Sequence, residues 1–204
     1  MKLRLSVAAV LAATTFLGVV GSAQAQTIST GHWDVGLEYD CATATFSELH
    51  AHNHDTGVEY ELADATFAVS GTSNSIWEQQ VFGGSALPVK VIGDGGTFRV
   101  GFAVEPIGTC SPPSVTFRSV GTPTVPSGLR AAAYRRAETD GSASPRTRID
   151  TVTGSNRNLG IAVSDHEDLR WGFTGTGTYT LNLRAVRTSN NTVLDTQPLT
   201  FGVS

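Results

Sequence analysis

Three of the five histidines in the chain fall within five residues. They are His50, His52 and His54, and Asp55 follows directly. Successive side chains of a β-strand point to opposite faces, so histidines at every second position share one face. Neutral imidazole nitrogens and carboxylate oxygens are common ligands of zinc. The spacing therefore predicts a divalent-metal site on a strand, with His50 and His52 as its first pair of ligands.

The other two histidines also lie among acidic residues. His32 stands in the run Gly-His-Trp-Asp, and His166 stands in Asp-His-Glu-Asp. A His-x-His pair leaves a tetrahedral ion short of ligands, so we expect the fold to bring His32 and His166 to the central cluster. His54 is expected where the strand turns, as a further ligand or just outside the ligand set. The carboxylates that can bind the ion, or hold the imidazole tautomers, are Asp34, Asp55, Asp165 and Asp168.

An alternative interpretation is that the histidines form a polar stripe on the solvent face. In that case His50, His52 and His54 would join the nearby acids in a structural network without an ion. Trp33 and Trp171 stand next to the histidine motifs. We expect both indoles to pack in the core or against the wall of the site.

The elements that position these residues are expected to be strands. From Gln26 onward, short alternating runs are separated by turn residues, a pattern typical of a sandwich or barrel. Leu129–Thr139 fits a strand or a short helix equally well. The expected strands are His32–Tyr39, Thr45–His52, Val58–Glu61, Thr66–Val69, Ser75–Val81, Val89–Ile92, Thr97–Val104, Val115–Val120, Arg130–Glu138, Arg148–Val152, Gly160–Val163, Leu169–Thr174, Thr178–Thr188 and Thr192–Val203.

The clearest of these strands is Thr178–Thr188. Its apolar residues alternate with polar ones, and Asn190-Asn191 follows as a turn before the last strand. The sequence thus predicts a C-terminal hairpin within an all-β domain. The predicted fold is a single immunoglobulin-like or jelly-roll-like β-sandwich over residues 26–204.

Residues 1–25 read as a secretory signal peptide. Lys2 and Arg4 precede the apolar run Leu5–Val20, and Ala23-Gln24-Ala25 is a small-x-small cleavage signal. Cleavage after Ala25 would release the domain to the periplasm or cell surface. No later apolar stretch approaches membrane length, so the mature chain is expected to have no membrane span.

Cys41 and Cys110 are the two cysteines. In an exported chain two cysteines usually pair, and closing so long a loop stabilises a fold by about 4 kcal/mol in the chain-entropy model. We therefore predict a disulfide between them. The alternative is a thiolate metal ligand.

The charge balance is mildly acidic. The formal net charge is −4, and without Lys2 and Arg4 it becomes −6. Nucleic-acid binding calls for a basic face, so no nucleic-acid partner is expected.

Three stretches carry a resemblance to a known family: Gly31–Gly36 (GHWDVG), Leu49–Tyr60 (LHAHNHDTGVEY) and Asp165–Leu181 (DHEDLRWGFTGTGTYTL). They resemble the bacterial surface-anchored domain, also called the choice-of-anchor M domain. The resemblance implies an exported all-β domain of cell-surface proteins. Family members often lie near genes for metal-type ABC transporters, which implies a role in metal handling and envelope or transporter components as partners. This chain has Glu167 or Asp168 where the family's closing motif usually has a second histidine.

Three functions follow from these observations. The first is a non-enzymatic module that captures a divalent metal, zinc being the expected ion. The second is a structural or adhesive domain of the cell envelope that binds no metal. The third is a metal hydrolase, because His50–Asp55 is similar to the His-x-His-x-Asp-His run of metallo-β-lactamase-like enzymes with its last two letters exchanged. That fold needs helices on both faces of its sheets, which this sequence does not predict.

Overall fold

A computed structural model describes residues 25–83, 88–93, 97–135, 146–152 and 160–204. The predicted signal peptide, apart from Ala25, lies outside the described residues. Within the described residues no helix is both long enough and apolar enough to cross a membrane.

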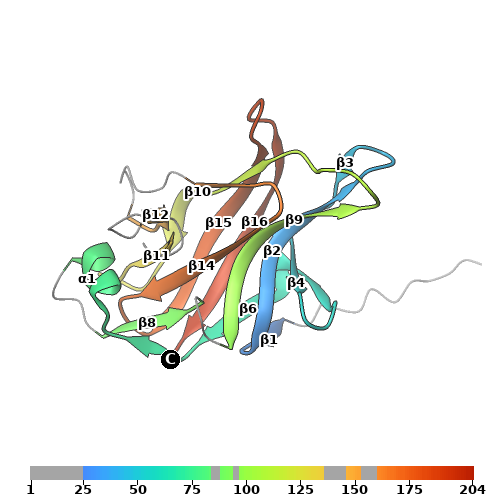
Figure 1. Ribbon diagram of the computed structural model, residues 1–204. Coiled ribbons are helices and arrows are strands. Elements are labelled where there is room, and N and C mark those ends of the chain that lie inside the picture. Colours follow the sequence, from blue (N-terminus) through green and yellow to red (C-terminus); the bar gives the residue numbers. More distant parts are fainter. Residues whose placement is uncertain (1–24, 84–87, 94–96, 136–145, 153–159) are drawn as a thin grey trace, which may run out of the picture.

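Two β-sheets form the domain (Figure 1). The first has six strands, in the order β1 (Gln26–Ile28), β6 (Ala65–Val69), β16 (Val193–Val203), β15 (Gly177–Arg187), β10 (Val115–Thr124) and β13 (Ile161–Val163). The path of the second runs through β12 (Arg146–Asp150), β11 (Ala131–Arg135), β14 (His166–Phe173), β9 (Phe98–Ile107), β2 (Gly31–Asp40), β4 (His50–Asn53) and β5 (Glu59–Glu61). Off this path lie β3 (Thr45–Phe46), β7 (Thr72–Ser73) and β8 (Val89–Ile92). The 3-10 turn η1 (Leu62–Asp64) follows β5.

The two sheets pack face to face through aromatic side chains. Phe102 of β9 stacks on Phe117 of β10 with ring centroids 4.8 Å apart, and Trp171 of β14 contacts Phe201 of β16 at 4.7 Å. All four side chains are fully buried. The apolar core between the sheets confirms the predicted β-sandwich.

The predicted C-terminal hairpin is also confirmed. β15 and β16 pair antiparallel along almost their full lengths, and the alternating residues Tyr179, Leu181 and Leu183 are buried. Asn191 in the turn has a φ of 56°, in the left-handed region that asparagine tolerates better than most residues.

The predicted strand Ser75–Val81 is wrong, because this segment forms the helix α1 (Ile76–Phe82). Ser75 and Glu78 form a capping box that satisfies backbone N–H groups of its first turn. Glu78 is also buried, where it accepts hydrogen bonds from Tyr134 and Arg170. These contacts favour the helix over the strand suggested by local alternation.

The undecided segment Leu129–Thr139 contains β11, so its described part is a strand rather than a helix. β11 lies between β12 and β14, and Ala131 to Tyr134 are buried there. Residues 136–139 lie outside the described part of the chain. Burial on both sides of β11 explains why small alanines occupy it.

Cys41 and Cys110 form the predicted disulfide, with Cα atoms 5.9 Å apart. Cys41 directly follows β2, and Cys110 lies three residues after the end of β9. These two strands pair in parallel over ten residues. The bridge therefore ties together the ends of the two central strands, at the upper right of Figure 1.

Candidate metal centre

Neighbouring strands bring two carboxylates and one imidazole into one row across the second sheet. Asp34 of β2 pairs with Gly101 of β9 on one side and with His52 of β4 on the other. Gly101 in turn pairs with Asp168 of β14. Paired residues of adjacent strands share a face, so Asp168, Asp34 and His52 project from the same surface.

His32 and His166 lie on this same face, each two residues from an aspartate of the row. They precede Asp34 on β2 and Asp168 on β14, and the strand period of two gives each histidine the orientation of its aspartate. These strands come from the two ends of the described chain. The predicted meeting of His32 and His166 thus depends on β9 lying between β2 and β14.

Four side chains converge here: His32, Asp34, His166 and Asp168, whose ligand atoms all lie within 4.8 Å of one another. His32 Nε2 lies 3.1 Å from both His166 Nε2 and Asp168 Oδ1. His166 Nε2 lies 3.1 Å from Asp34 Oδ1 and 3.5 Å from Asp168 Oδ1. His32 Nε2 and Asp34 Oδ1 are 3.9 Å apart.

These separations, 3.1 to 3.9 Å, are close to the edge lengths of a zinc coordination tetrahedron. With ligands at the usual 2.0–2.1 Å from the ion, each edge would measure about 3.3–3.4 Å. Two imidazole nitrogens and two carboxylate oxygens are also donors that suit zinc. The set of four therefore fits a divalent ion in both geometry and chemistry.

Asp34 is the most unusual member of the group. Its side chain is buried, and neither carboxylate oxygen accepts a hydrogen bond of good geometry from any described residue. His166 Nε2 lies 3.1 Å from Asp34 Oδ1, the distance of an ion pair when His166 is protonated. A buried carboxylate without hydrogen bonds is costly unless a positive charge compensates it.

The same negative charge acts on His166. Contact with Asp34 raises the pKa of His166 above its usual value, although burial opposes this, and the charges of Asp168 and Asp165 add to the rise. The neighbouring carboxylates therefore favour a positive charge on His166.

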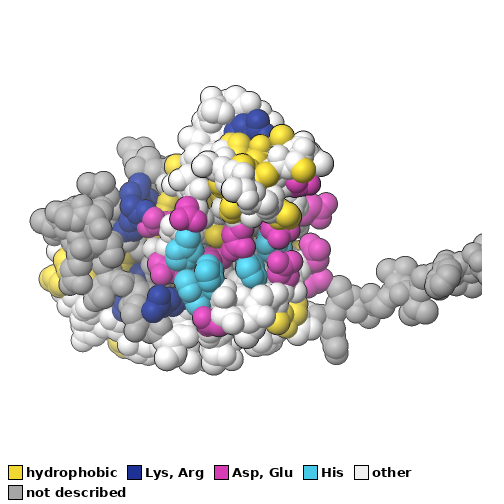
Figure 2. Space-filling model, turned by 45° about the vertical axis from the view of Figure 1, so that its right-hand side comes forward, with side chains coloured by type: hydrophobic (Ala, Val, Ile, Leu, Met, Phe, Trp, Pro, Cys, Tyr) yellow, Lys and Arg dark blue, Asp and Glu magenta, His cyan; other side chains and the backbone are white. Residues whose placement is uncertain are grey.

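His54 and His52 lie beside this group. The His54 ring stacks on His32, with centroids 5.1 Å apart, and contacts His166 at 5.8 Å. His52 Nδ1 is 3.0 Å from Glu105 Oε1 on β9. Asp34, His54 and Glu105 form a second set whose ligand atoms lie within 4.8 Å of one another. Figure 2 shows the histidines in two neighbouring groups on one face, with acidic side chains around and between them.

His50 does not join either set. Its Nδ1 lies 3.1 Å from the carbonyl oxygen of Glu48, and its ring lines a cavity of about 340 Å³ with Glu38, Glu59 and Glu61. The expected pairing of His50 with His52 as first ligands is therefore not what the described residues show. Across the sheet, His50 pairs with Gly36, Gly36 pairs with Ala103, and Ala103 pairs with His166. The strands β2 and β9 therefore lie between His50 and His166.

The turn after β4 explains why His54 reaches the group. The predicted strand Thr45–His52 is interrupted between β3 and β4, and it ends one residue later than expected. The Asn53 side chain accepts hydrogen bonds from the backbone N–H groups of Asp55 and Thr56. The His54 N–H then donates to the His32 carbonyl, which holds His54 against β2.

Two of the four candidate acids lie outside the ligand sets. Asp55 accepts a hydrogen bond from the backbone N–H of His32 at 3.3 Å, so it positions the start of β2. Asp165 is exposed, and its backbone carbonyl accepts a hydrogen bond from Val104. In contrast, Asp168 directs Oδ1 to the histidines, while its Oδ2 lies 3.5 Å from Arg99.

Glu105, Gly101 and Arg99 were not identified from the sequence. A Cβ atom on Gly101 would lie 2.7 Å from Asp34 Oδ1 and 3.3 Å from Asp168 Oδ1, so glycine leaves room for both carboxylates. Arg99, Gly101 and Glu105 occupy one face of β9 at even spacing. The even spacing of these residues can be read from the sequence, but no neighbouring residue indicates that this face of β9 belongs to the histidine site.

The two tryptophans pack as expected. Trp171 is fully buried and donates to the carbonyl of Val100. Trp33 donates to the carbonyl of Thr30 and stacks on Tyr60 with centroids 5.6 Å apart. Both indoles lie under the site strands and fix them to the core.

Comparisons with known proteins do not assign a family. No protein-family profile matches the chain, and no characterised protein matches it in sequence. One similar solved structure is that of the N-terminal domain of PorA, at 10% sequence identity, with 72% of this chain and 92% of that chain covered and a TM-score of 0.36. This likeness is too low to support an argument about function. The resemblance to the surface-anchored family stays a prediction.

Proposed function

We propose that this protein is an exported, non-enzymatic β-sandwich that captures a divalent metal ion, with zinc the first candidate. The ligands are His32, Asp34, His166 and Asp168. The observation that carries the proposal is the buried Asp34 carboxylate, which has no hydrogen bonds of good geometry among the described residues and faces two imidazoles. A bound cation would supply the charge compensation that this group lacks.

The number of ligands supports capture rather than hydrolysis. Structural zinc sites have four protein ligands, whereas catalytic sites keep one position open for water or substrate. The four ligand atoms here are close enough to fill a tetrahedron. A domain that holds the ion in this way suits storage or delivery better than turnover.

The disulfide and the sequence resemblance support a location outside the cytoplasm. Structural disulfides persist mainly in oxidising compartments such as the periplasm and cell surface. The resemblance to surface-anchored domains suggests metal handling at the cell envelope, with envelope or transporter components as partners. The alternative function is a structural or adhesive envelope domain in which the same residues form a network without metal.

Zinc titration of the purified chain, stripped of metal with a chelator, tests the proposal. At 100 times the dissociation constant, binding to the native state alone adds about 2.7 kcal/mol, or about 5–10 °C in melting temperature. We expect this shift in the wild type and its loss in His166→Ala. His50→Ala removes an imidazole outside both ligand sets, so it serves as the matched control and should keep the shift.

Asp34→Asn separates metal binding from a structural network. We expect this variant to lose the zinc response, while its metal-free melting temperature stays within about 2–4 °C of wild type, the change that 1 kcal/mol produces. Asp165→Asn is the control and should respond to zinc normally. A wild-type protein without a zinc response, together with a marked metal-free destabilisation in Asp34→Asn, would support the structural network instead.

A further inference from the structure

Asp34 presents its two oxygens to two different sets of ligands. Oδ1 lies 3.1 Å from His166 Nε2, within the group of four. Oδ2 lies 3.9 Å from His54 Nε2, on the side of the second set. The second set is completed by Glu105, and its three ligand atoms lie within 4.8 Å of one another.

A single ion at Oδ1 would satisfy only half of the Asp34 carboxylate. Both oxygens are buried and both lack a hydrogen bond of good geometry among the described residues. Oδ2 would then remain a buried acceptor without a partner, which is unfavourable in a protein interior. The observation that supports the first ion therefore applies equally to a second one.

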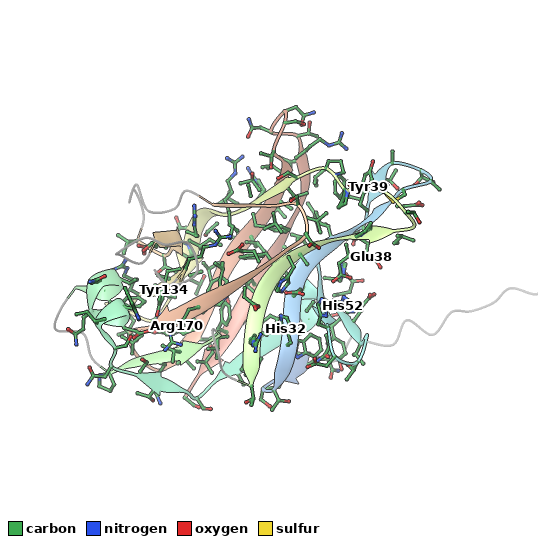
Figure 3. The ribbon with its side chains drawn as sticks, viewed as in Figure 1. His32, Glu38, Tyr39, His52, Tyr134 and Arg170 are labelled. Carbon is green, nitrogen blue, oxygen red and sulfur yellow. A yellow bond between two sulfur atoms is a disulfide. The ribbon has the colours of Figure 1, made fainter. Side chains whose placement is uncertain are left out.

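The residues around Oδ2 are arranged to hold a cation. His52 Nδ1 lies 3.0 Å from Glu105 Oε1, a contact that orients the Glu105 carboxylate. His54 is held by its backbone hydrogen bond to His32 and by the stacking of the two rings. Glu38 is the register partner of Glu105 on β2, so further negative charge lies on that side of the site. Figure 3 shows His32 and His52 on the neighbouring strands β2 and β4.

We propose that the protein holds two divalent cations bridged by the Asp34 carboxylate. The first is bound through Asp34 Oδ1 with His32, His166 and Asp168. The second is bound through Asp34 Oδ2 with His54 and Glu105. This inference rests on the proposed function, because the first ion occupies the site assigned there, and it gives His52 a positioning role.

The two ions should bind with different affinities. The first has four protein ligands, whereas the second has three. His54 and Glu105 are also more exposed, with side-chain exposures of 53% and 32%, against 1% for Asp34. We therefore expect a tight first equivalent of zinc and a weaker second one.

Metal stoichiometry tests the two-ion site. Equilibrium dialysis of the purified chain against increasing free Zn²⁺, followed by metal analysis, should give two equivalents per chain. Glu105→Gln and His54→Ala should each retain the tight equivalent and lose the weak one. His50→Ala should still bind two equivalents, and near-ultraviolet circular dichroism checks that each variant is folded.

Cobalt gives an independent readout of the bridge. When Co²⁺ replaces Zn²⁺, the electron paramagnetic resonance signal per ion should fall as the second equivalent binds, because a shared carboxylate couples the two ions. The first equivalent alone should give an uncoupled signal. Glu105→Gln should show that uncoupled signal at every Co²⁺ concentration.

The outcomes separate this inference from the proposed function. One equivalent in the wild type, lost in His166→Ala but unchanged in Glu105→Gln, would overturn the second ion and leave the proposed function standing. Two equivalents that persist in both Glu105→Gln and His54→Ala would place the second ion elsewhere and overturn the assignment. No bound metal at all would overturn both.

Discussion

At the scale of single residues, the site depends on side chains that are unremarkable in the sequence. Asp34 is one acid among many, and only its burial beneath two imidazoles distinguishes it. Gly101 has no side chain, and this leaves room for the Asp34 and Asp168 carboxylates next to the backbone of β9. Binding of a cation here requires that both carboxylates keep their positions.

We predict that Gly101→Ala weakens zinc binding. The added methyl would lie 2.7 Å from Asp34 Oδ1 and 2.9 Å from the backbone oxygen of Glu167, so the carboxylate has to move. Displacing a ligand or its support typically costs about 10–100-fold in metal affinity. Competition with a chromogenic zinc chelator measures the change.

Gly202→Ala is a suitable control for this substitution. Gly202 lies in β16 of the other sheet, and its added methyl would meet only Thr66 Cγ2 at an ordinary 3.5 Å. It should bind zinc as the wild type does. Equal affinities in Gly101→Ala and wild type would show that Asp34 is not a required ligand.

At the scale of elements, the helix α1 shows how a buried ion pair can override local pattern. Glu78 lies on α1, Arg170 on β14 and Tyr134 on β11. Figure 3 shows Tyr134 and Arg170 near the helix. The three side chains attach the helix to the sheet that carries His166 and Asp168, and Arg170 lies two residues after Asp168 on β14.

We predict that Glu78 makes the fold sensitive to acid. Burial alone would raise the pKa of Glu78, but hydrogen bonds from Ser75, Tyr134 and Arg170 outweigh it and lower the pKa from 4.5 to about 2. As the pH falls, Glu78 is therefore protonated in the unfolded chain at a higher pH than in the folded protein. The free energy of unfolding decreases as the pH falls from about 4.5 towards 2.

Chemical denaturation between pH 2 and pH 7 checks this prediction with Glu78→Gln. This variant should be less stable at pH 7, because Arg170 loses its charged partner, and its stability should fall less steeply below pH 4.5. Glu61→Gln, at an exposed position, should follow the wild-type curve. Parallel pH curves for Glu78→Gln and wild type would contradict the assignment.

At the scale of the whole molecule, the disulfide and the candidate metal centre lie at different ends of the same central strands. The bridge follows the C-terminal ends of β2 and β9, whereas His32 and Asp34 lie near the start of β2. Strands rise about 3.3 Å per residue, so Asp34 and Cys41 are separated by roughly 20 Å along β2. The two features should therefore act independently.

We predict that Cys41→Ala/Cys110→Ala lowers stability without changing metal stoichiometry. The bridge spans a sequence separation of 69 residues, and closing such a loop contributes about 4 kcal/mol in the chain-entropy model. Urea denaturation measures the loss, and dialysis against zinc measures the bound metal below the new midpoint. Loss of zinc binding in the folded double variant would show that the bridge also positions the site.

Much of the architecture could be predicted from local patterns. Period-two alternation identified most strands, because a strand packed on one face must alternate apolar and polar residues. It failed at Ser75–Val81, where the competing signal was a capping box and a buried partner on another strand. The sequence spacing also predicted that the histidines share one face of a strand, but it could not show which of them lie close enough together to bind one ion.

The sequence by itself determined the chemical inventory: five histidines, their neighbouring acids, two cysteines and strands to carry them. Only the tertiary structure decided that β9 lies between β2 and β14, which brings His32, Asp34, His166 and Asp168 together and leaves His50 apart. The reason is physical. Metal ligation requires atoms within a few ångströms, and the order of strands in a sheet depends on long-range pairing and core packing, which alternation within each strand does not encode.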